Sequence, residues 1–404
     1  MEKKNQVPKY PLLRFPEFTD EWKKVKLGEV GEYVRGLTYG TDDVQDTGTI
    51  VIRANNLNDG CPIDFKTELV HVSILPDPHQ ILRNTDITIC MANGSSHLVG
   101  KASYCCDASL GTITVGAFCG IFRSTNDLVR WIFQTPTYKR YIYKAIQGGN
   151  GAIANLKGDD ILNQSYFLPS LPEQKKIAGL LSAIDERIEV QNAICNYLES
   201  LIVGFYSSVQ YVTKAGWHKV RLRDLLTIRK EQNTSGSYEV YSVSVSRGIV
   251  NQIVHLGRSF AAANTSNYGV VHPGDLVYTK SPTGQFPFGI VKQNHNASPV
   301  AVSPLYGVYR PISPEVGTLL HYFFLSPLRA NNYLAPLIQK GAKNTINIRT
   351  DHFLDNVVLL PKEEKELRCI ADCLLALDER LSVEKEYVEQ LKQQKVYLLR
   401  QMFI

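Results

Sequence analysis

Hydrophobic residues recur at alternating steps of four and three in two long stretches of the chain. Residues spaced in this way share one face of a helix and form the seam of a coiled coil. The first seam comprises Ile177, Leu181, Ile184, Ile188, Gln191, Cys195, Leu198, Ile202 and Phe205. The second comprises Ile370, Leu374, Leu377, Leu381, Glu384, Val388, Leu391, Lys395 and Leu398. The pattern predicts two helices of about forty residues, each about 60 Å long.

Two helices of equal length favour pairing with each other, although a single core-facing helix would show the same stripe. In an antiparallel pair, the polar seam residues Gln191 and Glu384 would fall in the same or adjacent layers. A buried polar residue in a seam can fix the register of the pair. Two alternatives stay open, because both side chains are long enough to reach solvent or to face a third protein.

The two halves of the chain are similar to each other in sequence. Three landmarks return in the same order at offsets of 192 to 195 residues: 184–188 (Ile-Asp-Glu-Arg-Ile) as 377–381 (Leu-Asp-Glu-Arg-Leu), 22–30 (Trp-Lys-Lys-Val-Lys-Leu-Gly-Glu-Val) as 217–225 (Trp-His-Lys-Val-Arg-Leu-Arg-Asp-Leu), and Asn155-Leu156 as Asn347-Ile348. Self-similarity at a fixed offset is typical of a repeated structural unit. The chain is therefore predicted to be two copies of one unit, each ending in a long helix.

Outside the seams, short apolar runs alternate with Gly, Asn and Pro turns, which is typical of short strands. Predicted strands lie at 48–53, 86–91, 111–115, 238–243, 275–279 and 305–309, and predicted helices lie at 126–145 and 317–338. The sequence thus predicts a mixed α/β fold with two pseudo-repeated α/β domains, separated by a pair of long antiparallel coiled-coil helices. The predicted boundaries are 1–166 and 213–357 for the domains, and 167–212 and 358–404 for the helices.

The overall composition is that of an ordinary globular protein. Of the 404 residues, 44% are hydrophobic and 21% are charged, which excludes collagen-like and disordered chains. No apolar run approaches the ~18 residues of a membrane span, and the polar, basic start has no signal-peptide core. A cytoplasmic protein is therefore expected. The eight cysteines include no Cys-x-x-Cys pair, so reduced thiols are expected rather than disulfides or a metal site.

Positive charge is concentrated in one part of the chain. The net charge is +5, but residues 1–166 hold 18 basic and 18 acidic residues, whereas residues 210–357 hold 15 and 7. A local excess of this size is typical of a domain with a polyanionic partner. A bias that serves solubility alone is the alternative explanation.

Motifs for catalysis are missing from the sequence. The segment from Gly94 to Ala102 resembles a phosphate-binding loop, but five residues instead of four separate its glycines, and Ala102 has no hydroxyl for magnesium. The sequence has no Asn/Asp-Pro-Pro-Tyr/Phe tetrapeptide of an adenine methyltransferase, no His-Glu-x-x-His and no Gly-x-Ser-x-Gly. Asp77 with Glu173 and Lys175 could form a nuclease motif, but surface charge at a helix start explains the second part more simply. No catalytic residue, cofactor or metal is therefore expected.

Several short segments stand at defined places around the helices. They are Arg14-Phe-Pro-Glu-Phe18, Glu21-Trp22, Lys26-Leu27-Gly28, and Leu168-Pro-Ser-Leu-Pro-Glu-Gln-Lys-Lys-Ile-Ala178, together with Leu/Ile-Asp-Glu-Arg in both helices. The second helix opens with Leu360-Pro-Lys-Glu-Glu-Lys-Glu-Leu367, which lacks the Pro-x-x-Glu-Gln form. Over essentially the whole chain, this combination strongly resembles the specificity (S) subunit of Type I restriction-modification systems.

The resemblance implies a DNA-binding subunit without catalytic activity. In such a subunit, two target recognition domains each read one half of a bipartite asymmetric site, and the paired helices hold them apart. Two modification subunits, which bind S-adenosylmethionine and methylate adenine at N6, dock on it. Restriction subunits complete an endonuclease that defends the host against foreign DNA. The expected partners are double-stranded DNA and these subunits, with no membrane and no cofactor on the chain itself.

Base recognition requires amides and other hydrogen-bonding groups on loops, with cations nearby for phosphate. The DNA-binding candidates in the first domain are Arg53, Asn55, Asn56, Asn93, Ser95, Ser96 and Lys101. Those in the second domain are Arg247, Lys280, Thr283, Gln285, Lys343 and Asn344. For each of them the alternative is a solvated turn, since Asn, Ser, Gly and Lys populate turns for backbone reasons.

Two other functions would fit part of the pattern. A coiled-coil interaction adaptor without DNA readout would explain the seams but not the two loop-rich domains. An enzyme with an unrecognised site would lack any known motif. DNA binding that weakens with salt and prefers one sequence separates the first hypothesis from both alternatives.

Overall fold

The computed structural model describes residues 10–147, 154–212, 216–253, 264–340 and 346–404. The chain divides into two compact units. The first unit comprises Met1–Val190 and Val388–Ile404, and the second unit comprises Gln191–Tyr387. Both units consist of short strands in several sheets with a few helices, so the predicted mixed α/β class is confirmed.

The first unit contains two four-stranded sheets, with strand orders β2-β10-β6-β8 and β3-β5-β4-β9. Its elements are β1 (Lys23–Lys26), α1 (Leu27–Val30), β2 (Glu32–Arg35), β3 (Val44–Gln45), β4 (Thr49–Ile52), β5 (Val70–Val72), β6 (Ile87–Cys90), β7 (Ala92–Asn93), β8 (Ala102–Tyr104), β9 (Ile113–Val115), β10 (Cys119–Arg123), α2 (Val129–Ile132), α3 (Pro136–Gln147), β11 (Ala154–Asn155), α4 (Gly158–Leu162) and β12 (Ser165–Leu168). The first sheet is antiparallel throughout, whereas β4 and β9 pair in parallel. β1 pairs with β12, so the domain closes on its own first strand directly before the long helix begins.

The core of the first unit is assembled from both ends of the chain. Its largest buried cluster includes Trp131, Phe133, Leu181, Leu398, Leu399 and Met402. The Leu13 amide also donates a hydrogen bond to the Gln401 carbonyl (2.9 Å). The last turns of the chain therefore stabilise the domain in which the chain begins.

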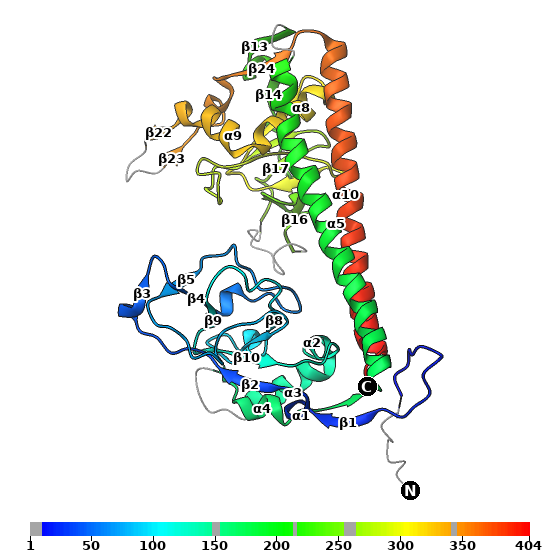
Figure 1. The fold of residues 1–404 in the computed structure, drawn as a ribbon. Coiled ribbons are helices and arrows are strands. Elements are labelled where there is room, and N and C mark those ends of the chain that lie inside the picture. The colour runs from blue at the N-terminus through cyan, green and yellow to red at the C-terminus, as the bar shows by residue number, and fades with distance from the viewer. Residues whose placement is uncertain (1–9, 148–153, 213–215, 254–263, 341–345) are drawn as a thin grey trace. The chain divides into compact units, whose positions relative to one another are not determined.

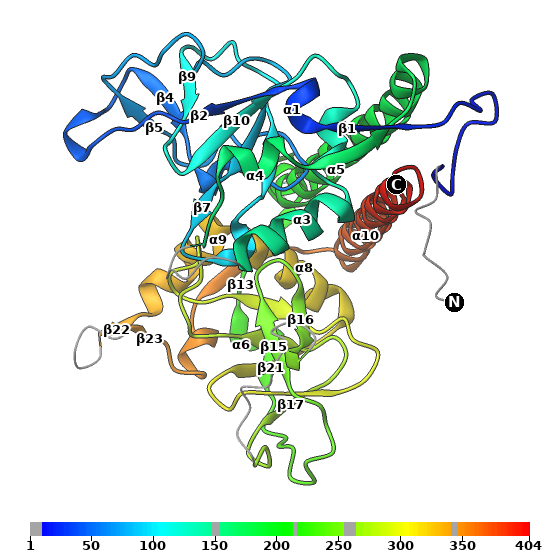
Figure 2. The same ribbon diagram turned by 90° about the horizontal axis from the view of Figure 1, so that it is seen from below.

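The second unit repeats this plan. Its elements are β13 (Trp217–Arg221), α6 (Leu222–Leu225), β14 (Leu226–Ile228), β15 (Tyr241–Ser244), β16 (Gly248–Asn251), β17 (Gly269–Val271), β18 (Leu276–Tyr278), β19 (Val291–Gln293), β20 (Val300–Val302), β21 (Gly307–Pro311), α8 (Pro314–Leu325), α9 (Pro327–Leu334), β22 (Gln339–Lys340), β23 (Ile346–Asn347) and β24 (Val357–Pro361). The sheet order β14-β21-β18-β19 matches β2-β10-β6-β8, and β13 pairs with β24 as β1 pairs with β12. Figure 2 shows β15 and β16 of this unit as an antiparallel hairpin. The sequence repeat is thus a repeat of one fold.

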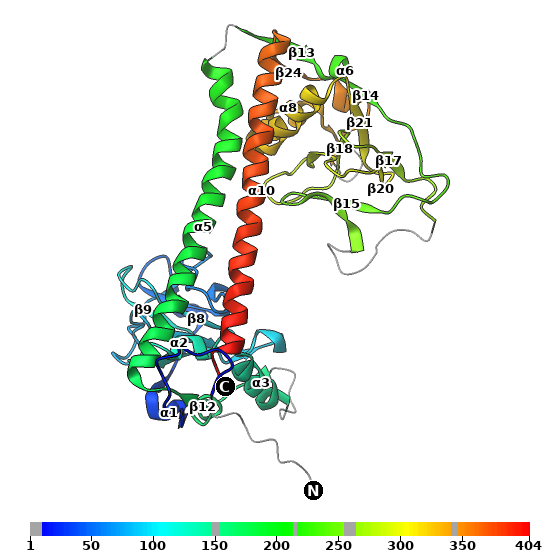
Figure 3. The same ribbon diagram turned by 90° about the vertical axis from the view of Figure 1, so that its right-hand side faces the viewer.

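The two predicted long helices are α5 (Leu171–Val212, 42 residues) and α10 (Glu364–Gln401, 38 residues). Their predicted length of about forty residues is confirmed, and Figures 1 and 3 show each as one unbroken helix. In the first unit, Lys395 Nζ lies 2.6 Å from the Asp185 carboxylate. In the second unit, Lys385 Nζ lies 2.6 Å from the Glu199 carboxylate. Residue numbers rise along one helix and fall along the other, so the helices pair antiparallel.

In two places where the sequence predicts one helix, the structure has two helices with a proline at the start of the second. The prediction of one helix over 126–145 is wrong, because α2 ends before Pro136 and α3 begins at it. The prediction of one helix over 317–338 is wrong for the same reason, because α9 begins at Pro327. Proline has no amide to donate inside a helix, but it fits the first turn of a new one. Each proline therefore starts a helix instead of continuing it.

Three further observations bear on chemistry. All eight cysteines are free thiols. Within the part of the chain that the structure describes, no three His, Cys, Asp or Glu side chains converge as a metal site would require. The helices of that same part include none that is long and apolar enough to cross a membrane.

Candidate nucleic-acid interface

A buried aspartate fixes the strand that leads to one candidate loop of the first unit. Asp86, directly before β6, is 2% exposed. Its carboxylate accepts hydrogen bonds from the Arg83 amide (2.8 Å) and from the Arg123 guanidinium (2.7 and 2.9 Å). The hydrogen bonds to Asp86 raise the pKa of Arg123 above its ordinary value. β6 therefore holds the loop from Asn93 to Lys101 in a defined position.

The second unit has the same arrangement before its own candidate loop. Asp275, directly before β18, is 2% exposed. It accepts hydrogen bonds from the His272 amide (2.8 Å) and from the Arg229 guanidinium (2.6 and 3.0 Å). The side-chain hydrogen bond to Asp275 raises the pKa of Arg229. The segment from Lys280 to Gln285 follows β18 directly.

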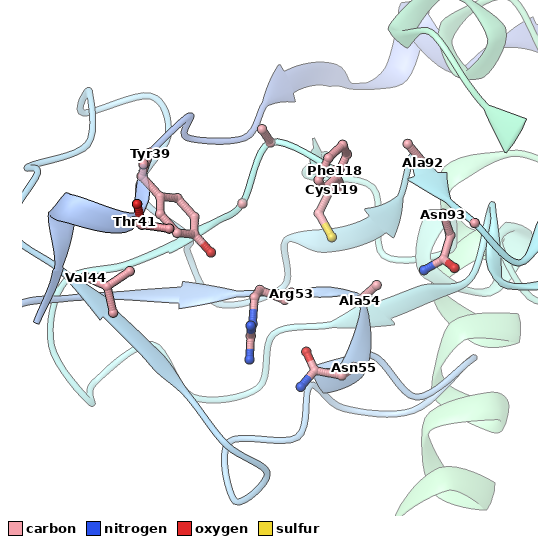
Figure 4. A pocket seen from close by; sticks show the side chains of 14 residues that line it. Tyr39, Thr41, Val44, Arg53, Ala54, Asn55, Ala92, Asn93, Phe118 and Cys119 are labelled. Carbon is pink, nitrogen blue, oxygen red and sulfur yellow. The ribbon is translucent and has the colours of Figure 1, made fainter. Parts of the chain in front are cut away.

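Three candidates of the first unit line one pocket. Arg53 and Asn55 follow β4, and Asn93 ends β7, and all three belong to the lining of a pocket of about 590 Å³. Figure 4 shows their side chains around it, together with the aromatic side chains of Tyr39 and Phe118. A concave surface with apolar walls and a few polar groups is typical of a binding site.

Arg53 is half-buried at this pocket, and its Nε is buried without a hydrogen-bond partner. Its neighbour Asn56 is fully buried. Asn56 Oδ1 accepts a hydrogen bond from the Arg53 amide (3.0 Å), and its Nδ2 donates to the Asp64 carbonyl (3.4 Å). Asn56 therefore supports the loop backbone, and in this conformation its amide has no exposed surface to offer a base.

The remaining candidates of the first unit lie on the turn after β7. Ser96 and Lys101 line a second hollow of about 360 Å³. The Ser95 amide donates to Asn93 Oδ1 (2.9 Å), and Ser95 Oγ lies 2.9 Å from His97 Nδ1. Ser95 thus stabilises the turn itself, whereas Ser96 and Lys101 line the hollow beside it.

Two cationic candidates of the second unit follow different strands. Arg247 is exposed on the turn between β15 and β16, where Gly248 has a φ of 71°. Lys280 is half-buried after β18, and its burial lowers the pKa of its ammonium group. Arg247 is therefore the more accessible of the two cations.

The other candidates of the second unit lie on turns as well. Thr283 and Gln285 are exposed, and Thr283 exchanges backbone hydrogen bonds with Phe286 (3.0 and 2.9 Å). Lys343 and Asn344 lie outside the described residues. The proposed DNA contacts of all these residues stay predictions.

Reasoning from the sequence missed two exposed hydrophobic residues on matching connections between two sheets. Phe118, between β9 and β10, is 68% exposed, and Leu305, between β20 and β21, is 74% exposed. The Phe118 carbonyl accepts hydrogen bonds from the amides of Met91 (2.8 Å) and Ala92 (3.1 Å), which hold the backbone of this connection in place. Neither residue belongs to a periodic pattern. The one available signal was a large apolar residue inside a turn of small residues.

The seam residues lie mostly in the interior. The buried ones are Ile177, Leu181, Ile184, Val388, Leu391 and Leu398 in the first unit, and Gln191, Cys195, Ile202, Ile370, Leu374, Leu381 and Glu384 in the second. Ile188, Leu198, Phe205, Leu377 and Lys395 are half-buried. Gln191 Nε2 donates a hydrogen bond to the Glu384 carboxylate, which also forms an ion pair with Arg380. The two polar seam residues thus contact each other, as an antiparallel pair requires.

Two copies of one loop-bearing α/β unit, with amides, arginines and an exposed aromatic ring on the loops, are compatible with the binding of nucleic acid. The family model of the Type I restriction modification DNA specificity domain matches residues 19–200. Just under half of the chain is therefore similar to the DNA specificity domain of Type I restriction-modification systems.

One solved structure of a Type I restriction-modification S subunit is similar to this chain in fold. The S subunit from M. genitalium has a TM-score of 0.56 at 12% identity, over 98% of this chain and 99% of that one. The HsdS subunit from Thermoanaerobacter tengcongensis has a TM-score of 0.36 at 15% identity, over 95% of this chain and 96% of that one. No curated protein sequence matches the chain. The similarity to the M. genitalium subunit concerns the fold alone.

Proposed function

We propose that the chain recognises a bipartite asymmetric DNA site, with one half-site read by each unit. Modification subunits that bind S-adenosylmethionine would dock on the chain and methylate adenine at N6, and restriction subunits would complete the endonuclease. The chain would contribute recognition and assembly, in the cytoplasm. Its recognition domains would be 1–166 and 213–357, and its spacer helices would be 167–212 and 358–404.

The observation that carries this proposal is one scaffold repeated with different loops. Arg53 lines a pocket with Asn55, whereas Arg247 is exposed on a hairpin turn. Bases are distinguished by the donors, acceptors and apolar groups that meet their edges. Two units with the same scaffold but different side chains on their loops should therefore prefer different half-sites.

The long helices support the role of a spacer. α5 and α10 each contribute residues to both units without a break. A continuous helix is a stiffer connection than a flexible linker. A coiled-coil adaptor without DNA binding would have the same helices, so DNA binding that weakens with salt is the property that separates the two functions.

Sequencing of methylated DNA from cells that carry the chain with its modification subunit tests the proposal. The expected result is one motif with two different halves and a fixed spacer, with a methylated adenine in each half. The absence of any motif, in cells where the complex is shown to assemble, would contradict it.

A pair of insertions tests the spacer role separately. Seven residues after Val190 and seven after Tyr387 lengthen both helices where they pass from one unit to the other. Each insertion adds about 10 Å and keeps the phase of the seam. The motif should acquire a different spacer or be lost while both units stay folded. An unchanged spacer would show that the helices do not set the distance.

A further inference from the structure

We propose that the pocket beside β4 in the first unit reads the major-groove edge of a guanine, with Arg53 donating to its N7 and O6 and Phe118 forming the apolar wall. This inference rests on the proposed function, because it assigns a base to one of the two recognition units. It also makes Arg53 a specificity-determining residue rather than a general phosphate contact.

The first argument is the state of Arg53 itself. Other partly buried arginines of the first unit are bound to carboxylates: Arg14 to Glu173 (2.7 Å), Arg123 to Asp86 (2.7 Å) and Arg130 to Asp185 (2.9 Å). Arg53 has no carboxylate partner among the described residues, and its Nε, like that of Arg130, is buried without a hydrogen-bond acceptor. Buried polar groups are nearly always hydrogen-bonded, since an unsatisfied donor costs free energy. The Arg53 guanidinium can therefore donate to the acceptors of a base without giving up an ion pair.

The second argument is that hydrogen bonds fix the backbone of the Arg53 loop in the absence of a ligand. The Arg53 carbonyl accepts a hydrogen bond from the Asn56 amide (2.9 Å), and Asn56 Oδ1 accepts one from the Arg53 amide (3.0 Å). Asn56 is 0% exposed, so this reciprocal pair is shielded from water. A guanidinium on a fixed backbone loses little entropy on binding, which is what specific recognition requires.

The third argument concerns the walls of the pocket. Phe118 is 68% exposed, yet its carbonyl is held by two backbone amides (2.8 and 3.1 Å). A rigidly presented aromatic ring beside a cation excludes water from a flat base edge. A contact to phosphate, in contrast, needs no apolar wall and carries no sequence information. Arginine bound bidentately to guanine is the commonest specific contact between proteins and DNA.

The second unit offers a contrast. Arg247 is exposed on a hairpin turn. An exposed arginine on a turn fits a phosphate contact, which carries no sequence information. The variant Arg247→Gln is therefore the natural control for Arg53→Gln.

The experiment measures methylation of duplexes by the complex of the full chain with its modification subunit. Each guanine of the recognised site is replaced in turn by 7-deazaguanine, which lacks the N7 acceptor. With the unchanged chain, one replacement should lower the methylation rate about 5- to 150-fold. With Arg53→Gln, the natural duplex should already be methylated more slowly by a similar factor, and that same replacement should have no further effect. With Arg247→Gln, the replacement should keep its full effect.

Several results would overturn the inference. A site without guanine, or a variant Arg53→Gln that still senses the replacement in full, excludes the contact. Retention of the natural rate by Arg53→Lys excludes it too, because lysine replaces the charge but not the bidentate fork. Failure of the unchanged complex to methylate any defined site would instead refute the proposed function. Circular dichroism of each variant separates loss of contact from loss of folding.

Discussion

In each unit a turn that ends in a buried aspartate precedes the strand leading to the candidate loop. The two units form this turn from different residues. Asp86 and Asp275 end the two turns, and each is 2% exposed. The residue before the aspartate has a positive φ in both units, 74° for Thr85 and 85° for Gly274. Glycine adopts this φ freely, whereas a β-branched threonine is strained there. The buried aspartate is thus common to both turns, while the residue that allows the turn is not.

The arginine that pairs with the aspartate also comes from a different strand in each unit. Arg123 is the last residue of β10, whereas Arg229 follows β14. β10 and β14 do not occupy matching places, since β14 corresponds to β2, the neighbour of β10 in the first sheet. The two arginines therefore reach matching aspartates from different strands of the sheet. A buried ion pair can therefore persist while one partner moves to the adjacent strand.

The fourth strand of the same sheet shows a larger difference. Ser103 of β8 lies opposite Thr88, and Lys292 of β19 lies opposite Val277, so the two residues take matching places. Ser103 is 1% exposed and Lys292 is 6% exposed. Ser103 exchanges hydrogen bonds with the backbone of Asn58 (2.6 and 2.8 Å). Burial lowers the pKa of Lys292 to about 8. The second unit thus buries an ionisable group where the first buries a neutral one.

The largest expected effect is that the first unit, but not the second, loses its stability when the C-terminal residues are removed. Deletion of 388–404 removes Leu398, Leu399 and Met402 from the core of the first unit. Each lost side chain costs about 2–5 kcal/mol, and together they approach the whole stability of a domain, about 5–15 kcal/mol. Hydrogen exchange should show loss of protection in the first unit and retention in the second.

The matched control is Tyr397→Ala, which removes a side chain that is 56% exposed on the same helix. It should leave protection in both units intact. Persistence of the first unit after the deletion would show that the C-terminal residues only cover its core.

The next effect tests whether the two buried aspartates are equivalent. Asp86→Ala and Asp275→Ala each leave an arginine without its carboxylate, and each should lower the free energy of unfolding of its own unit by about 3–5 kcal/mol. Chemical denaturation with a probe in each unit measures this. The control is Glu32→Gln, because Glu32 is an exposed partner of Arg123 at 3.5 Å and should contribute at most about 1 kcal/mol. If the two aspartate variants lost different amounts of free energy of unfolding, the two aspartates would not be equivalent.

A pH effect is expected in the second unit. The pKa of Lys292 falls from 10.5 to about 8 on folding, so the unfolded chain binds more protons between these values. The free energy of unfolding should therefore rise with pH through this window, by about 3 kcal/mol in all, and the penalty should be complete below pH 8. Lys292→Met should abolish this slope and stabilise the second unit near pH 7. Denaturation at several pH values, with Ser103→Ala as the control in the first unit, measures the difference. An identical slope in Lys292→Met would show that another group titrates.

The smallest effect concerns the strained turn. Thr85→Gly should stabilise the first unit by about 1 kcal/mol, because it relieves a positive φ that threonine adopts with strain. The gain is limited, since glycine also makes the unfolded chain more flexible. The reciprocal change, Gly274→Thr, should destabilise the second unit by about 1–2 kcal/mol. Midpoints of thermal unfolding measure both. A loss of stability in Thr85→Gly would mean that other contacts of the threonine outweigh the strain.

Parts of the candidate site were accessible from the sequence and parts were not. Arg53, Asn55 and Asn93 were singled out because amides and cations after short strands suit base recognition, and the structure brings them to one pocket. Asn56 has the same residue type as Asn55, but its side chain is buried. The difference arises from the direction in which each side chain leaves a short turn, and composition does not reveal that direction.

The sequence alone determined the features that depend on local periodicity. The seam repeats along a single helix, and the copies repeat at one offset, so both can be read without knowing any contact. The helix starts at Pro136 and Pro327 can also be read from the local sequence, because proline ends a helix through its effect on a few neighbouring residues.

Only the tertiary structure decided which distant segments meet. Phe118 lines the pocket of Arg53 because β4 and β9 pair in parallel. Leu398 completes the core of the first unit because α10 returns antiparallel to α5. The strand that supplies the arginine for each buried aspartate was decided in the same way. The physical reason is that each of these contacts joins segments far apart in the chain, and its free energy arises from burial and pairing that exist only after the whole unit has folded.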